Sequence, residues 1–328
     1  MGSAGKKPLV YVLDPYHPAA IELLKADTSV DVILPPEASK DDALPRATGI
    51  LLRSDTRINA ADLEGANSKL KFIVKQGVGV DNVDLQAAKS RNVGVFNTPG
   101  LNSESVAEMT LTLALCVARR VTEFDRKIRD GEKVVRSQML GKSLFRKSLG
   151  IVGMGAIGSE LAKKWKGAMN GPLIAFDPYA KEEAWHDLFG LEGFTRVQNL
   201  NDLLKAVDVV SLHVPLTTST TNLIGEKELA IMKDDAILLN CARGGVVDEA
   251  ALLKALQAGK LFGAGLDAMQ HEPPSRARYG ETLLTHPRVV LTPHVGASTE
   301  ENQAMSGRRA AEILLDLIAG RGEHQSLA

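Results

Sequence analysis

Cysteine and an imbalance of charge are both scarce in this 328-residue sequence, and each scarcity excludes a class of protein. Two cysteines make neither a disulfide framework nor a metal site, so a reducing compartment is the default. With a net formal charge of -1 and no long basic tract, nucleic acid is not an expected partner. The longest apolar stretch, 106–117, contains Glu108 and is too short to cross a bilayer. We expect a cytoplasmic protein without membrane contacts.

Short aliphatic runs alternate with helical patterns along the whole chain, which is typical of parallel α/β sheets. The length suits two domains, and a hydrophobic content of 44% supplies a core for each. The predicted strands of the first part are 9–13, 30–34, 49–52, 72–75 and 93–96. The predicted strands of the second part are 149–152, 173–176, 207–212, 236–239, 262–266 and 289–291.

Two long helical patterns set the expected domain borders. Residues 104–121 read as one helix that carries the chain into a second domain, and residues 300–317 read as a helix that returns to the first. We therefore expect a discontinuous domain of residues 1–103 and 297–328, and a dinucleotide-binding domain of residues 104–296. The segment 124–145 mixes charged and apolar residues and is expected to be an arm that contacts a partner surface.

The central motif is the stretch 148–158, in which a short apolar strand runs directly into glycines spaced G-x-G-x-x-G. Gly153 permits a tight turn, Gly155 permits close approach of a phosphate, and Gly158 lets the next helix pack on its strand. The alternative is an ordinary turn into a helix. Asp177 ends the next strand, about 20 residues further on, where an acid accepts hydrogen bonds from an adenosine ribose. Its alternative is a turn residue before Pro178.

Asp177 also predicts the cofactor. A carboxylate at this position binds ribose hydroxyls and repels a 2'-phosphate, so we expect NAD rather than NADP. The residues that follow directly, Pro178, Tyr179 and Ala180, offer no arginine to neutralise such a phosphate, although Lys181 is close.

Three strand ends later in the chain carry side chains suited to acid–base chemistry. Arg243 lies after a predicted strand and before two glycines, where a guanidinium can bind a carboxylate in a fork. Glu272 precedes a proline pair, and His294 follows the last predicted strand. Taken singly, each has an ordinary alternative: a surface arginine, a solvated carboxylate and a structural histidine.

Together with the motifs 52–54, 77–84, 97–99 and 293–299, these stretches resemble the D-isomer-specific 2-hydroxyacid dehydrogenases. Within that family the resemblance favours the D-3-phosphoglycerate dehydrogenase branch, and residues 240–248 are its most diagnostic part. It implies an α/β protein of two doubly wound parallel-sheet domains, a discontinuous flavodoxin-like substrate domain and a Rossmann nucleotide domain. It also implies a homodimer or higher oligomer formed through the nucleotide domain.

The resemblance assigns the family's three catalytic positions to Arg243, Glu272 and His294. Removing a hydroxyl proton while hydride leaves C2 needs a group that exchanges protons near neutral pH, which suits histidine. Glu272 would orient the ring and favour the imidazolium, and Arg243 would hold the substrate carboxylate. Backbone amides at Val78 and Gly79 are expected to hold the same carboxylate.

By the same resemblance, the chain binds NAD through residues of several loops. Ala156 and Ile157 are expected at the pyrophosphate, Val214 and Pro215 at the adenine or ribose, and Asp267 at the nicotinamide carboxamide. Cys241 is expected to form a wall near the cofactor rather than to act as a nucleophile. The remaining expected cofactor contacts are Ala242 and Ala297.

The expected substrate is a D-2-hydroxy acid with a second anionic group, 3-phosphoglycerate as first choice. Arg53 and Arg57 follow the third predicted strand and Lys75 ends the fourth. All three are expected to bind the anionic tail, although Arg53 and Arg57 also read as solvated loop charges. A lysine binds phosphate as a point charge without an arginine's fork. Alternatives on the same scaffold are a glyoxylate or hydroxypyruvate reductase and a sulfonated hydroxy-acid dehydrogenase. An alternative of another class is a nucleotide-sensing transcriptional corepressor.

Overall fold

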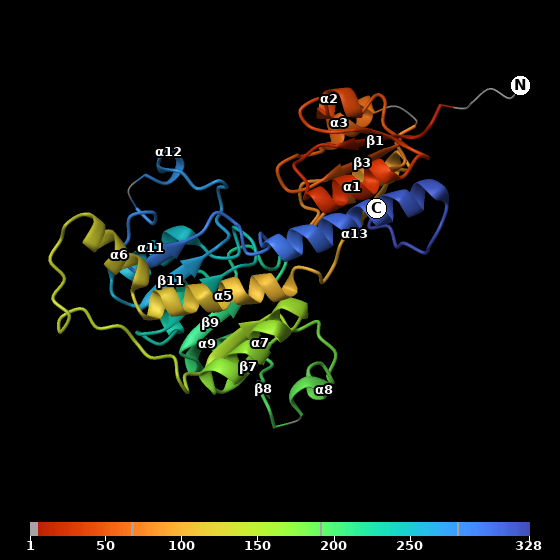
Figure 1. Cartoon of the computed structure of the whole chain (residues 1–328). Helices are drawn as coiled ribbons and strands as arrows, with labels where there is room; N and C mark the ends of the chain where they lie inside the picture. The colour runs from red at the N-terminus through yellow and green to blue at the C-terminus, as the bar shows by residue number, and fades with distance from the viewer. Residues whose placement is uncertain (1–5, 67–68, 191, 281) are drawn as a thin grey trace, which may run out of the picture. The chain divides into compact units, whose positions relative to one another are not determined.

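Each of two units of the chain is built on its own parallel sheet (Figure 1). The computed structural model describes residues 6–66, 69–190, 192–280 and 282–328. Unit 1 comprises residues 1–102 and 297–328, and unit 2 comprises residues 103–296. The expected border lay one residue later, between 103 and 104. The expected fold class, two doubly wound parallel-sheet α/β units, is confirmed.

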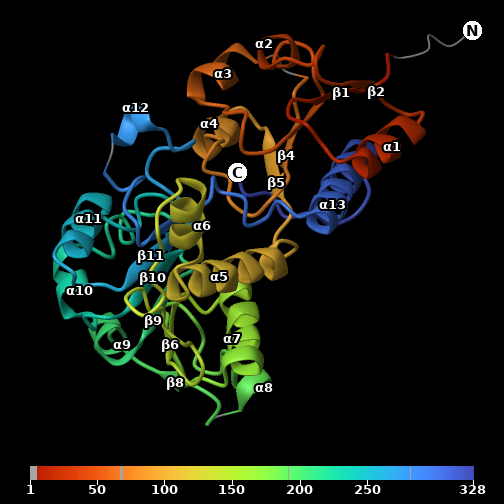
Figure 2. The same cartoon turned by 60° about the vertical axis from the view of Figure 1, so that its left-hand side comes forward.

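The described strands of unit 1 form a five-stranded parallel sheet in the order β2-β1-β3-β4-β5, which is the flavodoxin-like order. All four residues of the central strand β3 are buried, because helices cover both faces. Helices α1 and α13, from opposite ends of the chain, lie side by side on one face (Figures 1 and 2). The strands are β1 (Leu9–Val12), β2 (Asp31–Ile33), β3 (Gly49–Leu52), β4 (Phe72–Lys75) and β5 (Gly94–Asn97). The helices are α1 (Pro18–Ala26), α2 (Lys40–Ala43), α3 (Ala60–Gly65), α4 (Leu85–Ser90) and α13 (Glu300–Ala319).

The described strands of unit 2 form a seven-stranded parallel sheet in the order β12-β11-β10-β9-β6-β7-β8. The chain order reverses between β6 and β9, and open α/β sheets bind ligands beyond the carboxyl ends of the strands at such a point. The strands are β6 (Leu149–Val152), β7 (Leu173–Phe176), β8 (Thr195–Arg196), β9 (Val209–Leu212), β10 (Ile237–Asn240), β11 (Gly263–Leu266) and β12 (Val289–Leu291).

Helices cover both faces of this second sheet as well. Helix α5 packs on α7 and on β10 and β11, while α9, α10 and α11 supply leucines to the core of the other face. The helices are α5 (Ser103–Ala118), α6 (Val121–Arg129), α7 (Ala156–Met169), α8 (His186–Phe189), α9 (Leu200–Ala206), α10 (Glu226–Ile231), α11 (Glu249–Gln257) and α12 (Arg276–Tyr279).

The expectation of one continuous helix over 104–121 is wrong. Helix α5 ends at Ala118 and α6 begins at Val121, because Arg120 adopts a left-handed conformation with φ of 55°. The Arg120 guanidinium donates two hydrogen bonds to the Glu123 carboxylate, at 2.7 and 2.8 Å, which stabilises this break. The apolar periodicity of the sequence continues through both helices. It therefore does not reveal that the backbone of one residue, Arg120, leaves the helical conformation.

The two-residue strand β8 is the other difference. Six strands were predicted for the second part, and β8 extends the sheet beyond β7. The run Thr195–Arg196 is too short for an alternating pattern, so pairing with β7 alone makes it a strand.

Among the described helices, none combines the length and apolar character that a bilayer crossing needs. The described residues also contain no group of three or more histidine, cysteine or acidic side chains placed to hold a metal ion. Both cysteines are free thiols: Cys241 is buried and Cys116 is half-buried.

Candidate active site

Of the three glycines after β6, local geometry requires Gly153 and Gly158, whereas Gly155 leaves open space. Gly153 has φ of +103°, and a Cβ on it would stand 2.6 Å from the carbonyl oxygen of His213. A Cβ on Gly158 would stand 2.4 Å from the Gly153 carbonyl oxygen, so only glycine lets α7 approach the strand this closely. At Gly155 a Cβ would meet nothing within 4 Å, and this residue caps α7 without a side-chain acceptor. The first turn of α7, with exposed Ala156 and half-buried Ile157, is thus open to an anion.

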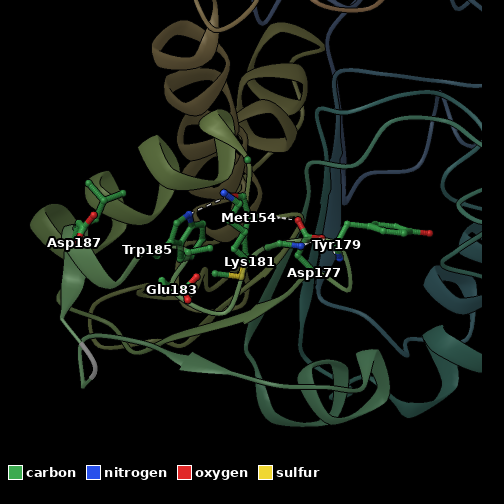
Figure 3. A pocket seen from close by; sticks show the side chains of 11 residues that line it. Met154, Asp177, Tyr179, Lys181, Glu183, Trp185 and Asp187 are labelled. Atoms are coloured by element: carbon green, nitrogen blue, oxygen red, sulfur yellow. Dashed lines mark hydrogen bonds between the residues drawn. The ribbon is translucent and has the colours of Figure 1, made fainter.

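Asp177, at the end of β7, ties this glycine turn to its own loop. Its Oδ2 accepts a hydrogen bond from the Met154 amide at 2.9 Å, and Oδ1 accepts from the amides of Tyr179 and Ala180 at 2.8 and 3.1 Å. On the other side of Met154, the Trp185 indole donates to the Met154 carbonyl at 3.1 Å (Figure 3). These residues border a cavity of about 600 Å³. Its lining is Met154, Gly155, Asp177, Tyr179, Ala180, Lys181, Glu183, Ala184, Trp185, Asp187 and Leu188.

The end of β9 lies against the same turn. A Cβ on Gly153 would stand 3.3 Å from Val214 Cγ1, so Val214 borders the glycine turn, and Pro215 follows it at the surface. His213 binds Ser211 Oγ through Nε2 at 2.8 Å, and its Nδ1 is buried without a hydrogen-bond partner among the described residues. Burial lowers the pKa of this histidine to about 4, so its ring is neutral at physiological pH.

The loop after β10 holds Arg243 and is held in turn by Asn240. The Asn240 amide donates to the Arg243 carbonyl at 2.9 Å and to the Ala268 carbonyl at 3.3 Å, and its oxygen accepts from the Ala242 amide at 3.1 Å. Asn240 is 1% exposed, so these contacts are shielded from water. The sequence prediction missed Asn240, although a buried amide directly after an apolar strand is a usable signal.

Cys241, the residue after Asn240, is buried in the structure. Burial, the largest cause, raises the pKa of its thiol to about 12, which leaves it protonated and a poor nucleophile.

Glu272 and His294, 22 residues apart, form a hydrogen-bonded pair. His294 Nδ1 lies 2.9 Å from Glu272 Oε2 and 3.1 Å from Oε1, and both side chains are 37% exposed. The Met269 amide donates to Glu272 Oε1 at 3.1 Å. Burial raises the pKa of the Glu272 carboxyl, but the His294 ring, the Met269 amide and the charge of Arg243 outweigh it and hold the pKa below its usual range. The carboxylate is therefore ionised, and Arg243 acts on the same group electrostatically.

Asp267, after β11, fixes the loop that carries His294. Its Oδ1 accepts from Thr292 Oγ1 at 2.6 Å and from the Val295 amide at 2.9 Å, and its Oδ2 accepts from the Gly296 amide at 2.8 Å. His294 has φ of 57°, a left-handed conformation that costs a non-glycine residue about 1–2 kcal/mol. The Asp267 contacts on both sides of the loop hold this conformation, a task that the sequence prediction did not assign to Asp267.

The expected substrate residues Val78, Gly79, Arg53, Arg57 and Lys75 all belong to unit 1. Val78 is 41% exposed, and its carbonyl accepts from Asn97 Nδ2 at 2.6 Å. Lys75 is 6% exposed, and its Nζ lies 3.6 Å from where a Cβ of Gly77 would stand, so the ammonium is next to the 76–79 turn.

The two arginines are placed differently from Lys75. Arg53 donates to the Pro15 carbonyl at 3.1 Å. Arg57 lines a second cavity of about 230 Å³ with Asp81 and Asp84, and the described lining of that cavity includes neither Arg53 nor Lys75. A common anion site for the three cations stays a prediction, as does a cofactor contact of Ala297, whose carbonyl accepts from Asn302 Nδ2 at 2.6 Å.

The sheet order, the glycine turn and the His294–Glu272 pair at the carboxyl ends of the same parallel sheet are the arrangement of a dinucleotide-dependent oxidoreductase. Residues 111–296 match the family model of the D-isomer specific 2-hydroxyacid dehydrogenase NAD-binding domain. The chain belongs to the D-isomer specific 2-hydroxyacid dehydrogenase family. The expectation of an NAD-dependent enzyme is thereby confirmed at the level of the family.

Individual relatives agree with this assignment. The chain is 38% identical over 314 residues, 95% of its length, to a D-3-phosphoglycerate dehydrogenase of Methanocaldococcus jannaschii, of which it spans 57%. It is 39% identical over 306 residues, 92% of its length, to a hydroxypyruvate reductase of Thermotoga maritima, of which it spans 96%. The crystal structure of D-lactate dehydrogenase from Aquifex aeolicus complexed with NAD and lactic acid matches with a TM-score of 0.80 and 28% identity, covering 95% of this chain and 96% of that one. These relatives are named as enzymes and give no support to the corepressor alternative.

The residues present fit NAD. The uncapped first turn of α7 offers backbone amides to a pyrophosphate, Gly155 leaves open space beside them, and the 600 Å³ cavity places a carboxylate, Asp177, at its wall. Arg196 is not among the residues that line this cavity.

Proposed function

We propose that the protein transfers hydride between C2 of a D-2-hydroxy acid and NAD, with proton transfer by His294. The observation that supports this most is the hydrogen bond between His294 Nδ1 and the Glu272 carboxylate, at 2.9 Å. An ionised carboxylate only accepts hydrogen bonds, so Nδ1 carries the proton and Nε2 is the nitrogen that exchanges one with substrate. In oxidation, Nε2 takes the hydroxyl proton as the C2–H bond breaks, and the 2-oxo acid forms. In reduction the same nitrogen returns the proton to the developing alkoxide.

Arg243 is proposed to bind the substrate carboxylate. A guanidinium presents a planar fork that matches a carboxylate, which fixes the orientation of C2 and polarises the adjacent carbonyl. The Asn240 contacts support this role because they hold the backbone on both sides of Arg243, whose Nη1 donates to the Ala242 carbonyl at 2.8 Å.

Unit 2 is proposed as the dinucleotide-binding domain and unit 1 as the substrate domain. The residues of unit 2 would hold NAD, whose nicotinamide C4 would supply the hydride acceptor in oxidation and, in reduced form, the hydride donor in reduction. Gly153, Gly155, Ala156, Ile157 and Gly158 would hold the pyrophosphate. Around them, Asp177, Val214 and Pro215 would bind the adenosine, and Cys241, Ala242, Asp267 and Ala297 would lie at the nicotinamide end.

3-Phosphoglycerate is the proposed first substrate. Lys75 supports this, since its ammonium lies beside the turn of Val78 and Gly79, which is proposed to bind the substrate. The names of the relatives leave hydroxypyruvate, or glyoxylate, as the second candidate, and a sulfonated hydroxy acid fits a lysine equally well. Arg53 and Arg57 are proposed as further contacts of the anionic tail.

The substrate proposal is tested by catalytic efficiency, kcat/KM. We expect 3-phosphoglycerate to exceed D-glycerate in the wild type, and Lys75→Ala to remove most of that preference. Lys71→Ala, at an exposed lysine just before β4, is the matched control. A wild type that prefers hydroxypyruvate or glyoxylate, or a Lys75→Ala variant with unchanged preference, would favour a general reductase.

A homodimer at least is also proposed, formed through unit 2. The chain after α6 loops out from the body of unit 2 (Figure 1). Both α6 and this following segment carry exposed apolar side chains. A stable pair usually buries roughly 2,000 Å² or more. The exposed apolar side chains of α6 and of the segment after it are Val121, Ile128, Val135, Leu140 and Phe145, which are 38–70% exposed.

Light scattering at micromolar concentration tests this: a dimer mass is expected, and Leu140→Asp with Phe145→Asp should yield monomers. A monomeric wild type contradicts the proposal.

A cytoplasmic location is proposed from the two free cysteines.

A further inference from the structure

Arg196 lies on β8, the strand that the sequence did not predict, and its guanidinium donates hydrogen bonds to backbone carbonyls of the turn that carries Asp177. Its Nη2 donates to the Asp177 carbonyl at 2.9 Å and to the Ala180 carbonyl at 2.7 Å. Its Nη1 donates to the Lys181 carbonyl at 2.6 Å and lies 3.5 Å from the Glu182 carbonyl. One half-buried guanidinium therefore contacts carbonyls along the whole turn 177–182, which we call the cofactor turn.

The cofactor turn is thus held from two sides by opposite charges. The Asp177 carboxylate accepts hydrogen bonds from amides of the turn and of Met154, while the Arg196 guanidinium donates to carbonyls of the turn. Hydrogen bonds in which one partner is charged are stronger than those between neutral groups. Arg196 therefore contributes to the orientation in which the cofactor turn holds the Asp177 carboxylate.

The placement of the two charges separates their tasks. Asp177 lines the 600 Å³ cavity, and so does Lys181, whereas Arg196 is absent from its described lining. The guanidinium donors point to carbonyls, so they are not presented as a fork to a phosphate in the cavity. Lys181 is exposed and belongs to the turn itself, so its reach depends on the turn's conformation.

We propose that Arg196 is a positioning residue for cofactor choice: it holds the cofactor turn so that Asp177 faces the cavity and NAD is bound in preference to NADP. Without the guanidinium, the four carbonyls are rehydrated and the turn gains alternative conformations. Asp177 then repels a 2'-phosphate less consistently, and the Lys181 ammonium can approach one. The inference rests on the proposed binding of the adenosine end of NAD by Asp177.

The test measures dissociation constants of NADH and NADPH by quenching of tryptophan fluorescence, since Trp185 lines the cavity. For Arg196→Met we expect NADH binding to weaken about tenfold and NADPH binding to be unchanged or tighter, so that the ratio of the two constants falls at least about tenfold. The kcat with NAD should stay within about twofold, because the loops of His294 and Arg243 do not contact Arg196. A loss of folded protein alone would weaken both constants equally and leave the ratio unchanged.

Matched variants sharpen the test. Arg196→Lys keeps the charge but replaces the fork by one point donor, so an intermediate ratio is expected, and this variant decides the matter if Arg196→Met does not fold. Arg278→Met removes an exposed arginine of α12 and should leave the ratio unchanged. Adding Lys181→Met to Arg196→Met should weaken NADPH binding again.

The two possible failures are distinguishable. A wild type that binds NADPH as well as NADH contradicts the role of Asp177. A wild type that discriminates, with an unchanged ratio in Arg196→Met or, where that does not fold, in Arg196→Lys, overturns the role of Arg196.

Discussion

Two loops of unit 2 are each organised by one charged side chain, and the charges are opposite. At the loop 292–296, which carries the proposed proton carrier His294 and which we call the catalytic loop, the Asp267 carboxylate accepts from two amides and a hydroxyl. At the cofactor turn 177–182, the Arg196 guanidinium donates to carbonyls. Both charges act on backbone groups of their loop.

The two loops differ in burial, and the difference predicts how each responds to mutation. Asp267 is 1% exposed, so its removal leaves amides that water reaches poorly, and buried unpaired groups cost about 1–3 kcal/mol each. Arg196 is half-buried, so water can replace its contacts. We therefore expect loss of Asp267 to lower activity and stability together. Loss of Arg196 should reduce the preference for NAD over NADP and leave turnover nearly unchanged.

The largest expected effect is at the side chain that the catalytic loop presents. His294→Ala removes the proposed proton carrier, and we expect kcat to fall by about 10²-fold or more in both directions, with the KM for NAD little changed. Steady-state kinetics with a saturating second substrate measures this. Near-normal turnover would mean that the proton comes from another group. His271→Ala, at a nearby exposed histidine, is the control.

Arg243→Ala should have an effect of similar size but with a different kinetic pattern. Loss of the guanidinium removes the proposed carboxylate contact, so the substrate KM should rise and kcat should fall, together lowering kcat/KM about 10²-fold or more. Arg243→Lys keeps the charge without the fork and should recover part of the loss. An unchanged substrate KM in Arg243→Ala would contradict carboxylate binding there.

Asp267→Asn tests the comparison directly. The amide keeps the size of the side chain but presents an NH₂ group to the donors of the 292–296 loop. We expect kcat to fall roughly 10–100-fold and the free energy of unfolding to fall by about 1–3 kcal/mol. Kinetics and urea unfolding measure the two effects. Thr292→Val, which removes one donor, should show a smaller version of both. Unchanged kcat in Asp267→Asn would show that His294 holds its conformation without this carboxylate.

Glu272→Gln should move the pH–rate profile more than the maximal rate. Replacing this ionised carboxylate by a neutral amide removes the negative charge beside the proposed proton carrier, so both the oxidative and the reductive profiles should shift to lower pH. Oxidation then starts at lower pH, and reduction at neutral pH weakens. Glu249→Gln, whose carboxylate accepts from the Gln270 amide at 2.6 Å, is the control. Superimposable profiles would remove Glu272 from the proton path.

The last prediction concerns stability rather than activity, at His213, which follows β9 between the two loops. Burial lowers its pKa to about 4 from 6.5, so the unfolded chain binds more protons than the folded one between these values, and stability is lost as pH falls through that window. His213→Gln should remove this loss, on the order of 2–3 kcal/mol at pH 4 relative to pH 7. Urea midpoints at both pH values measure it, with His271→Gln as the control. Parallel acid losses in wild type and variant would contradict the assignment.

Much of the fold was predictable from sequence because its determinants are local. Buried parallel strands are short aliphatic runs, and β3, β4, β6, β7 and β12 occupy the predicted residues. The fingerprint glycines are readable because the turn needs a positive φ at Gly153 and a close approach at Gly158. The break at Arg120 was not predictable, since it depends on one non-glycine residue in a left-handed conformation that an ion pair stabilises.

The sequence by itself determined the strands, the glycine turn and, through motif resemblance, the identities of Arg243, Glu272 and His294. Only the tertiary structure decided which groups meet. Glu272 reaches His294 across the ends of β11 and β12, Asp267 reaches Val295 and Gly296, and Arg196 reaches the cofactor turn from β8. Each of these contacts joins residues that sheet order makes neighbours. Sheet order depends on strand pairing over long sequence separations, which no local pattern of residues encodes.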